Sequence, residues 1–449
     1  MKKSDSITSI GIVGGGIAGI TAAIKLAKSG HFSVTVFEKE EEIGGLSSTY
    51  HWQDLACDRF YHVILPADLY LLQLIRDLGL ESGLFWTKTM SGFYGDGHLV
   101  SLSSMRDFIR FPFLSLGQKF RLGLGILYAN RIQTPYNLDS ISARMWLTRL
   151  FGVGIYEKIW EPLLRSKFGD ASDRVAASLV WATIKRLYGT RRSVEKQEVM
   201  GHVQGGYKTI FEAAGRMLHN LGAKILSGVR IEKVAIDRQN RKILVASASG
   251  RFQFDRLLMT SPCEEALQII EDDKQNPYWQ CLAQIEYLGV ICLFLVLKRQ
   301  LSPYYVINLL DRTLPFTGIV ESTNVISPGN FGGRYLVYLP KYVGRDDPFI
   351  NVSDREISSH FLEGLKQVFP DLNESDILHK RIFREKYVQP VLDIGFSKKQ
   401  VGFRTPMPGV YLVNSSMITD STLNSNAMVR LAQQVAEAII RDSVIQTAD

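Results

Sequence analysis

The feature that most constrains the fold is a run of glycines near the N-terminus, Gly14-Gly15-Gly16-Ile17-Ala18-Gly19, which directly follows the apolar segment 8–13. It fits the pattern G-x-G-x-x-G. In this pattern Gly14 permits a tight turn, Gly16 lets the backbone approach a pyrophosphate, and Gly19 lets a helix pack closely on a strand. Apolar residues then recur at helical spacing through residues 17–29. The segment predicts a strand, a turn and a helix whose N-terminus faces phosphate groups.

A second strand with a carboxylate at its end completes this unit. Residues 34–37 (Val-Thr-Val-Phe) are rich in β-branched residues, and Glu38 follows them, 19 residues after Gly19. A carboxylate at this position accepts hydrogen bonds from both ribose hydroxyls of an adenosine and disfavours a 2′-phosphate. The four parts together predict a dinucleotide site that is not built for NADP.

A second glycine pair distinguishes between the dinucleotides. Gly44-Gly45-Leu46-Ser47 begins six residues after Glu38, behind an acidic run. An NAD enzyme has no need of this pair, and an ordinary loop is the alternative explanation. Glycines here let the chain pass beneath a longer dinucleotide without clashes from Cβ atoms. The spacing therefore favours FAD.

With these motifs in place, residues 10–46 resemble the signature of the flavin-containing amine oxidases. That superfamily also holds the protoporphyrinogen oxidases, the phytoene desaturases and the UDP-galactopyranose mutases. Four later parts of the chain are similar to family segments: residues 201–207, 222–229, 254–262, and 409–413 with the helix from about Asn426.

The resemblance implies an α/β fold with a Rossmann-like FAD-binding domain, a parallel sheet assembled from three chain segments. We expect this domain to comprise residues 1–62, 200–262 and 396–449. Residues 63–199 look mostly helical and would form a helical insertion or cap. Residues 263–395 mix strands and helices and would form a substrate-binding domain with an antiparallel sheet.

The motif and the resemblance together identify the residues expected to bind FAD. They are Gly14, Gly15, Gly16, Ile17, Ala18, Gly19, Glu38, Lys39, Gly44, Gly45, Leu46, Val229, Ser261, Asn414, Ser415, Asn424 and Ala427. These residues depart from the family pattern at two places: the family usually has Gly-Asp where this chain has Asn414-Ser415, and a glycine at Asn424. A neutral side chain still hydrogen-bonds a hydroxyl, although more weakly than a carboxylate does.

The segment after the glycine pair resembles the family's D-x-G-x-H motif. Asp58 and His62 match its ends, and Phe60 stands in place of the glycine. The resemblance implies that His62 lies over the flavin ring, where an imidazole tunes the flavin or relays a proton. We take His62 and its neighbour Tyr61 as the candidate catalytic residues. The alternative is a histidine hydrogen-bonded to the backbone at the domain junction.

The charge and composition of the chain indicate which kinds of partner it can bind. Hydrophobic residues make up 46% and charged residues 22% of the 449, and the net charge is +7. No nucleic-acid motif accompanies the positive charge, so we expect no nucleic-acid partner. Residues 105–132 combine many apolar side chains with five basic residues and one acid. This segment is either a peripheral membrane contact or a core helix with solvated arginines. No apolar run reaches the length that spans a bilayer.

Other residues with a chemical character were weighed separately. Lys185, Arg186, Arg191, Arg192 and Lys196 form a second basic cluster, either a solvated loop or the site of a phosphate-bearing substrate. The four cysteines show no metal-ligand spacing, so we expect reduced thiols, no metal, and a cytoplasmic protein, with association to a membrane as the alternative. No cysteine follows residue 292. The cysteinyl-flavin linkage of some relatives is therefore excluded, and FAD is expected to be non-covalent.

Three functions fit these observations. The first is an FAD-dependent oxidase or dehydrogenase that takes a hydride from a C–N or C–C bond of a small substrate, lipophilic or phosphate-bearing. The second is a redox-neutral mutase acting on a sugar nucleotide or a lipid-linked sugar. The third is a flavin-binding protein without catalysis. The sequence identifies neither the substrate nor the electron acceptor.

Overall fold

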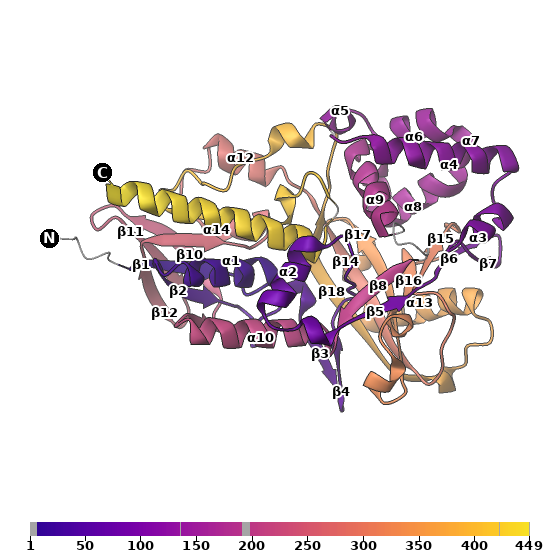
Figure 1. Ribbon diagram of the computed structural model, residues 1–449, viewed down its shortest axis with the longest axis horizontal. Helices are drawn as coiled ribbons and strands as arrows, with labels where there is room; N and C mark the ends of the chain where they lie inside the picture. The colour runs from indigo at the N-terminus through magenta and orange to yellow at the C-terminus, as the bar shows by residue number, and fades with distance from the viewer. Residues whose placement is uncertain (1–6, 135, 191–197, 422, 449) are drawn as a thin grey trace.

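The computed structural model describes residues 7–134, 136–190, 198–421 and 423–448. Figure 1 shows two lobes side by side. One lobe contains both ends of the described chain, and the other contains a group of short helices above a second sheet.

The helices and strands follow one another in this order. The helices are α1 (Ile17–Lys28), α2 (Leu69–Asp77), α3 (Met105–Arg110), α4 (Leu116–Arg131), α5 (Tyr136–Asp139), α6 (Ala143–Phe151), α7 (Val153–Ile155), α8 (Glu161–Phe168), α9 (Ala177–Thr190), α10 (Gly206–Asn220), α11 (Cys263–Ile269), α12 (Pro277–Ala283), α13 (Asp354–Val368) and α14 (Ser425–Ala448). The strands are β1 (Thr8–Val13), β2 (Phe32–Phe37), β3 (Thr49–Trp52), β4 (Leu55–Asp58), β5 (Leu84–Lys88), β6 (Ser91–Gly95), β7 (His98–Ser101), β8 (Val199–Val203), β9 (Lys224–Leu226), β10 (Ile231–Asp237), β11 (Lys242–Ser247), β12 (Gly250–Phe254), β13 (Arg256–Met259), β14 (Tyr287–Leu297), β15 (Val306–Leu309), β16 (Gly318–Glu321), β17 (Tyr335–Val343), β18 (Ile377–Pro390) and β19 (Val410–Leu412).

A parallel sheet with the strand order β19-β13-β1-β2-β9 forms the centre of the first lobe. Its strands come from three separate parts of the chain, as the sequence predicts. β1, β2 and α1 occupy the predicted places, with β2 beginning two residues earlier than expected. The carboxyl ends of parallel strands meet at one edge of a sheet, where ligands bind in open α/β folds. Gly14, Glu38 and Ser261 lie at or just beyond these strand ends.

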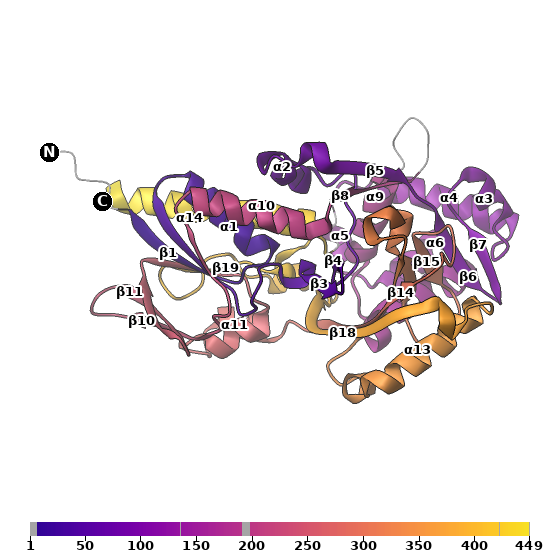
Figure 2. The same ribbon diagram turned by 90° about the horizontal axis from the view of Figure 1, so that it is seen from below.

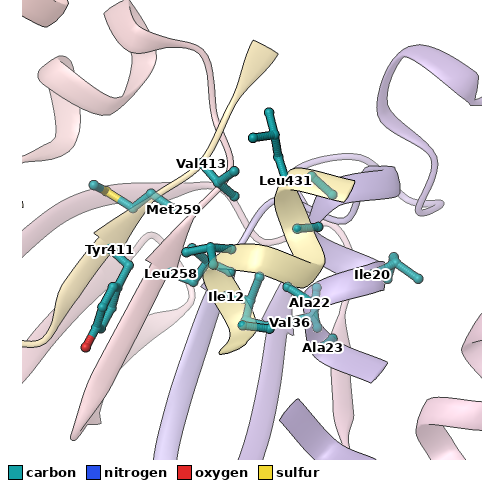
Figure 3. Packing of buried hydrophobic residues seen from close by; sticks show 14 of the residues in the cluster. Ile12, Ile20, Ala22, Ala23, Val36, Leu258, Met259, Tyr411, Val413 and Leu431 are labelled. Carbon is teal, nitrogen blue, oxygen red and sulfur yellow. The ribbon is translucent and has the colours of Figure 1, made fainter. Parts of the chain in front are cut away.

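Apolar side chains from the sheet and its helices form the core of this lobe. Ile12 on β1 pairs with Val36 on β2 and with Leu258 on β13, and all three are buried. Figure 3 shows this layer of side chains beneath α14, with Ala22 and Ala23 of α1 packed against it. Helices α1, α10 and α14 lie together on one side of this sheet (Figure 2), and α1 contacts both of the others. Side chains as small as alanine let α1 approach α14 closely.

A three-stranded antiparallel sheet, β10-β11-β12, also packs on the parallel sheet. Phe254 at the end of β12 contacts Phe37 edge-to-face, with ring centroids 5.8 Å apart. The sequence motifs did not anticipate this sheet because it contains no cofactor signature.

The second lobe is built on a sheet of seven strands in the order β18-β14-β17-β16-β15-β6-β7. All its neighbouring pairs are antiparallel except β15 with β6, so the expected antiparallel sheet is present with one parallel pair. Every residue of β14 is buried, which explains its unbroken apolar sequence. Helix α13 covers one side of this sheet (Figure 2).

Residues 63–199 differ in part from the expected helical insertion. Helices α3 to α9 form a helical group with its own core. However, β5 pairs with β8, and the hairpin β6-β7 extends the seven-stranded sheet. These strands are short and lack the long period-2 alternation that identifies a strand in sequence.

Candidate active site

The glycine turn has the geometry that the sequence predicts. Gly14 has φ +112°, which favours glycine, and its N–H donates to the carbonyl of Phe37 at 2.8 Å. A Cβ atom on Gly19 would lie 1.9 Å from the carbonyl oxygen of Gly14. Gly14 and Gly19 are therefore required by the protein's own packing.

Gly16 differs from these two glycines. A Cβ atom on Gly16 would meet nothing closer than the Cα of Gly45, at 3.8 Å, and its φ of −75° is open to any residue. The fold itself does not require glycine here. Gly16 is the N-cap of α1, where backbone N–H groups and the helix dipole favour an anion. The space beside Gly16 fits the pyrophosphate of a dinucleotide.

The second glycine pair closes against the first motif. The N–H of Gly44 donates to the carbonyl of Gly15 at 3.1 Å, and Gly45 has φ +57°. A Cβ atom on Gly45 would lie 3.3 Å from the Cα of Gly16. The two glycine motifs are thus in direct backbone contact, with Leu46 next in the turn.

Glu38 is buried at the end of β2. One oxygen of its carboxylate accepts the N–H of Gly15 at 2.7 Å, and the other accepts the N–H of Glu40 at 3.0 Å. Each carboxylate oxygen has a second lone pair for a ribose hydroxyl. The N–H of Val229 donates to the main-chain carbonyl of Glu38 at 2.8 Å, which places the predicted adenine contact beside the predicted ribose ligand. Lys39 instead points to Glu265, 3.1 Å away.

The closing turn after β19 uses its asparagine in a different way from the expected contact with the cofactor. Asn414 is buried, its Oδ1 accepts the N–H and the hydroxyl of Ser416, and its Nδ2 donates to the carbonyl of Ser261. Ser415 is half-buried. The Ser261 hydroxyl is buried and has no partner among the described residues. Ser261 and Ser415 are therefore better placed than Asn414 to hydrogen-bond a cofactor.

At the start of α14, Asn424 caps the helix. Its Oδ1 accepts the N–H of Ala427 at 2.9 Å. Asn426, two residues further along the chain, accepts the N–H groups of Tyr70 and Leu71 at 2.8 and 3.1 Å. The Asn426 side chain therefore caps α2 and ties it to α14.

His62 lies where the two lobes meet. Its Nδ1 faces the carbonyl of Phe60 at 2.8 Å, which assigns the proton to Nδ1 and leaves Nε2 to accept the hydroxyl of Ser47 at 3.1 Å. Burial lowers the pKa of His62 to about 4, so the imidazole is neutral at physiological pH. The backbone hydrogen bond of the alternative explanation is therefore present, and Ser47 also connects His62 to the second glycine turn.

Asp58 lies behind His62. Burial raises the pKa of its carboxyl to about 7, although the N–H of Tyr207 donates to it at 3.1 Å. The Tyr207 ring lies 4.7 Å from the imidazole of His62. A cavity of about 10 Å³ is lined by these three residues and the end of β8, and it is close to the size of one water molecule.

Four half-buried side chains form what we call the junction cluster: Tyr61, Lys167, Arg186 and Tyr342. The hydroxyls of Tyr61 and Tyr342 hydrogen-bond each other, and burial raises the pKa of Tyr61 well above its ordinary value. The Lys167 ammonium lies 5.7 Å from the centre of the Tyr342 ring. Burial, and then the charge of Arg186, lower the pKa of Lys167 to about 8.

The positive charges of Arg186 and Lys167, the two cations of the cluster, are neutralised to different extents. Arg186 reaches the buried Asp68, with their nearest charged atoms 3.3 Å apart. Lys167 has no carboxylate partner within the described ranges, and its neighbours are the rings of Phe168 and Tyr342. The sequence did not single out Lys167 or Tyr342. The one indication in the sequence is the position of Lys167, three residues after Leu164, which places this lysine on the apolar side of α8.

The second basic cluster divides. Arg186 turns inward to the junction cluster, while Lys185 donates to the carbonyl of Ile132 at 3.2 Å. Arg191, Arg192 and Lys196 lie outside the described residues. Elsewhere, a groove of about 710 Å³ between the β6-β7 hairpin and α8 contains none of the predicted site residues.

Comparison with known proteins gives consistent results. The model of the family "Flavin containing amine oxidoreductase" matches residues 17–425. A Mycobacterium tuberculosis protein named "Putative flavin-containing monoamine oxidase AofH" is 24% identical over 285 residues, and this match spans 61% of either chain. These shares mean that the chain spans less than two thirds of that relative's length.

Two solved structures show the same fold. An Exiguobacterium protein named "Putative protoporphyrinogen oxidase" superposes with a TM-score of 0.76 at 17% identity, over 97% of this chain and 99% of its own. Reduced UDP-galactopyranose mutase superposes with a TM-score of 0.73 at 17% identity, over 96% of this chain and 95% of its own.

Proposed function

We propose that this chain takes a hydride from a C–N or C–C bond of a substrate that carries a phosphate or carboxylate group. The chain belongs to the flavin-containing amine oxidoreductase family and is an FAD-dependent oxidoreductase. One observation carries the choice of substrate: Lys167 lies over the ring of Tyr342 in the junction cluster and has no carboxylate partner among the described residues.

The cofactor part of the proposal rests on the residues around Gly16. When bound, FAD supplies an acceptor for two electrons. The N-terminus of α1 and the cradle between Gly16 and Gly45 would hold its pyrophosphate, and Glu38 would hold its ribose. Ser261 and Ser415 offer hydroxyls for the remaining polar groups.

Tyr61 and His62 connect the cofactor side with the substrate side. His62 bonds Ser47 of the second glycine turn, and the preceding residue, Tyr61, bonds Tyr342 of the junction cluster. A neutral His62 with its proton fixed on Nδ1 is a poor proton donor, because protonation of Nε2 requires acid conditions. We therefore propose that His62 orients the turn under the flavin and that Tyr61 orients the substrate.

The junction cluster selects the charge of the substrate. An ammonium held away from water without an anion is costly, and a carboxylate or phosphate from the substrate offsets that cost through a charge-assisted hydrogen bond. A cationic amine would instead be repelled by Lys167, whose charge is not balanced by a carboxylate of the described residues, whereas Arg186 is paired with Asp68. The expected substrate is therefore anionic, in spite of the word "amine" in the family's name.

A redox-neutral mutase is the second candidate. The same two cations would suit the diphosphate of a sugar nucleotide or of a lipid-linked sugar, and a mutase is among the proteins with this fold. This candidate predicts turnover only when the flavin is reduced beforehand.

Anaerobic screening separates the candidates. The flavin absorbance of the purified protein is followed while anionic, neutral and cationic candidate substrates are added. Lasting bleaching by an anionic compound supports the proposal, and turnover seen only after dithionite supports the mutase. Lys167→Met, which keeps the length of the side chain, should lose the preference for anions. Bleaching by cationic amines alone, with Lys167→Met unaffected, would overturn the choice of substrate.

A further inference from the structure

Helices α3 and α4 carry an apolar surface that the proposed function does not use. We call it the outer apolar face, and it comprises Met105 (69% exposed), Ile109 (58%), Leu116 (76%), Phe120 (71%), Leu124 (53%), Leu127 (48%) and Tyr128 (58%). Residues 116, 120, 124 and 128 are spaced by four, so they follow one another along one side of α4. Contiguous exposed apolar side chains mark an interaction surface, whereas scattered ones do not.

This face is not a core face that has turned outward. A different side of α4 packs inward, with Leu122, Gly125 and Ala129 buried. A Cβ atom on Gly125 would lie 2.4 Å from the ring of Phe151, and the indole N–H of Trp181 donates to the carbonyl of Ala129. Rotating α4 to bury its outer residues would break this close packing.

Both helices hold the outer apolar face in a fixed position. Ser104 and Asp107 form a capping box at the start of α3, and Ser115 and Gln118 form another at the start of α4. Lys119 links the two helices by donating to the carbonyl of Ile109 at 2.6 Å. The face is therefore formed before any partner arrives.

The charges around the face are positive. Arg106, Arg110 and Arg131 are exposed, and none has an ion-pair partner in the described part of the chain. The only acid in residues 105–132 is Asp107, whose carboxylate is used in the capping box. The surroundings of the outer apolar face thus favour a negatively charged partner.

We propose that the outer apolar face binds an anionic membrane surface, with α4 lying in the plane of the interface. Its apolar side chains would enter the boundary between headgroups and acyl chains, and the arginines would meet anionic headgroups. In the part of the chain that the structure describes, no helix is long and apolar enough to cross a membrane. Figure 1 and Figure 2 place α3 and α4 at the end of the molecule opposite both termini.

A second copy of the chain fits this surface less well. A symmetric dimer brings the same patch of each subunit together. The exposed arginines of the two copies would then face one another around the contact, and like charges would oppose association.

Co-sedimentation of the flavin-loaded protein with lipid vesicles tests the proposal. Vesicles of phosphatidylcholine alone are compared with vesicles that also contain phosphatidylserine. The first variant is Leu116→Ser with Phe120→Ser and Leu124→Ser. The second is Arg106→Gln with Arg131→Gln. The matched control is Leu221→Ser with Leu378→Ser, two side chains that are 39% and 40% exposed and lie outside the face.

We expect the wild type to sediment with the anionic vesicles, and less as salt is added. The arginine variant should bind about 30-fold more weakly, since each basic residue near an anionic surface contributes about 1 kcal/mol. The serine variant should lose binding, and the control should keep it. Flavin absorbance and melting temperature show that each variant is folded. The proposal would be overturned if the wild type and the serine variant sedimented equally with the vesicles. It would also be overturned if the wild type did not bind vesicles but formed a dimer that the serine variant did not form. Neither result depends on which substrate the enzyme uses.

Discussion

Replacing Gly16 by alanine separates a glycine that serves the cofactor from one that serves the fold. The backbone of Gly16 already has φ −75° and ψ −179°, which alanine adopts without strain. Its new Cβ atom would meet only the Cα of Gly45, at the ordinary contact distance of 3.8 Å. Alanine is a poorer N-cap than glycine, which costs the apoprotein up to about 1 kcal/mol. Without FAD, the Gly16→Ala variant should therefore be nearly as stable as the wild type.

With FAD the outcome should differ. A methyl group in the cradle displaces the pyrophosphate from the backbone N–H groups of α1. Each hydrogen bond to a charged acceptor contributes about 1.5–3 kcal/mol, so losing two of them weakens binding by about 100-fold or more. FAD at 100 times the wild-type Kd stabilises the wild type by about 2.7 kcal/mol, and it would stabilise the variant by only about 0.4 kcal/mol.

Gly19→Ala is the contrasting variant. Its Cβ would lie 1.9 Å from the carbonyl oxygen of Gly14, so the strand and the helix must separate. Overpacking of this kind costs about 1–3 kcal/mol, which outweighs the gain of about 1 kcal/mol in helix propensity. Gly215→Ala in α10 is the control, because its Cβ would meet nothing within 4 Å.

The assay combines chemical unfolding of the apoproteins with titration of FAD. Gly19→Ala should lose stability without FAD, and Gly215→Ala should not. Gly16→Ala should lose at most about 1 kcal/mol without FAD, together with most of the stabilisation that FAD provides. If Gly16→Ala bound FAD as tightly as the wild type, the placement of the pyrophosphate would be wrong. If its apoprotein lost as much stability as that of Gly19→Ala, the distinction between the two glycines would be wrong.

Three further predictions follow from the site. Binding of an anionic substrate analogue should weaken as the pH rises through about 8, where Lys167 loses its proton, and isothermal titration of Lys167→Met should show no such step. The pKa of Lys167 is about 8 in the folded state and 10.5 in the unfolded state, so between pH 8 and pH 10.5 the unfolded state binds more protons. In this pH range Lys167 therefore makes the unfolding free energy rise with pH. Glu38→Gln should lower FAD affinity about 10-fold in a fluorescence titration, since one charged acceptor becomes neutral; unchanged affinity would remove Glu38 from the ribose site. Asn426→Ala should lower the unfolding free energy by about 1 kcal/mol through loss of the α2 cap, while Asn426→Asp should retain it; equal losses in both would contradict the capping role.

The cofactor half of the fold was predictable because its constraints are local. Gly14, Gly19 and Glu38 act within one strand-turn-helix-strand unit, and each residue type is dictated by a backbone angle, a close contact or a hydrogen bond that lies within about thirty residues. The contact between Gly16 and Gly45 is of the same kind, since the two are separated by a single helix and strand.

The role of Asn414 could not be read in the same way. Its position after β19 predicts a contact with the cofactor, but its side chain bonds Ser261 and Ser416 instead. Ser416 lies only two residues away, and a buried amide satisfies its own polar groups with the nearest available partners. A sequence motif gives the position of a residue, and the local hydrogen bonds decide which way its side chain points.

The junction cluster was hidden for a different reason. Tyr61, Lys167 and Tyr342 come from three distant parts of the chain, and only the packing of α8 on the seven-stranded sheet brings them together. No spacing rule connects residues 61, 167 and 342.

The outer apolar face also could not be predicted from the sequence alone. The composition of residues 105–132 reveals apolar and basic side chains together, but only the rotation of α4 about its axis decides whether Phe120 or Leu122 is buried. Since Leu122 is buried and Phe120 is exposed, the explanation in which this segment is a core helix accounts for only one of its two apolar sides, and the membrane contact that we propose accounts for the other.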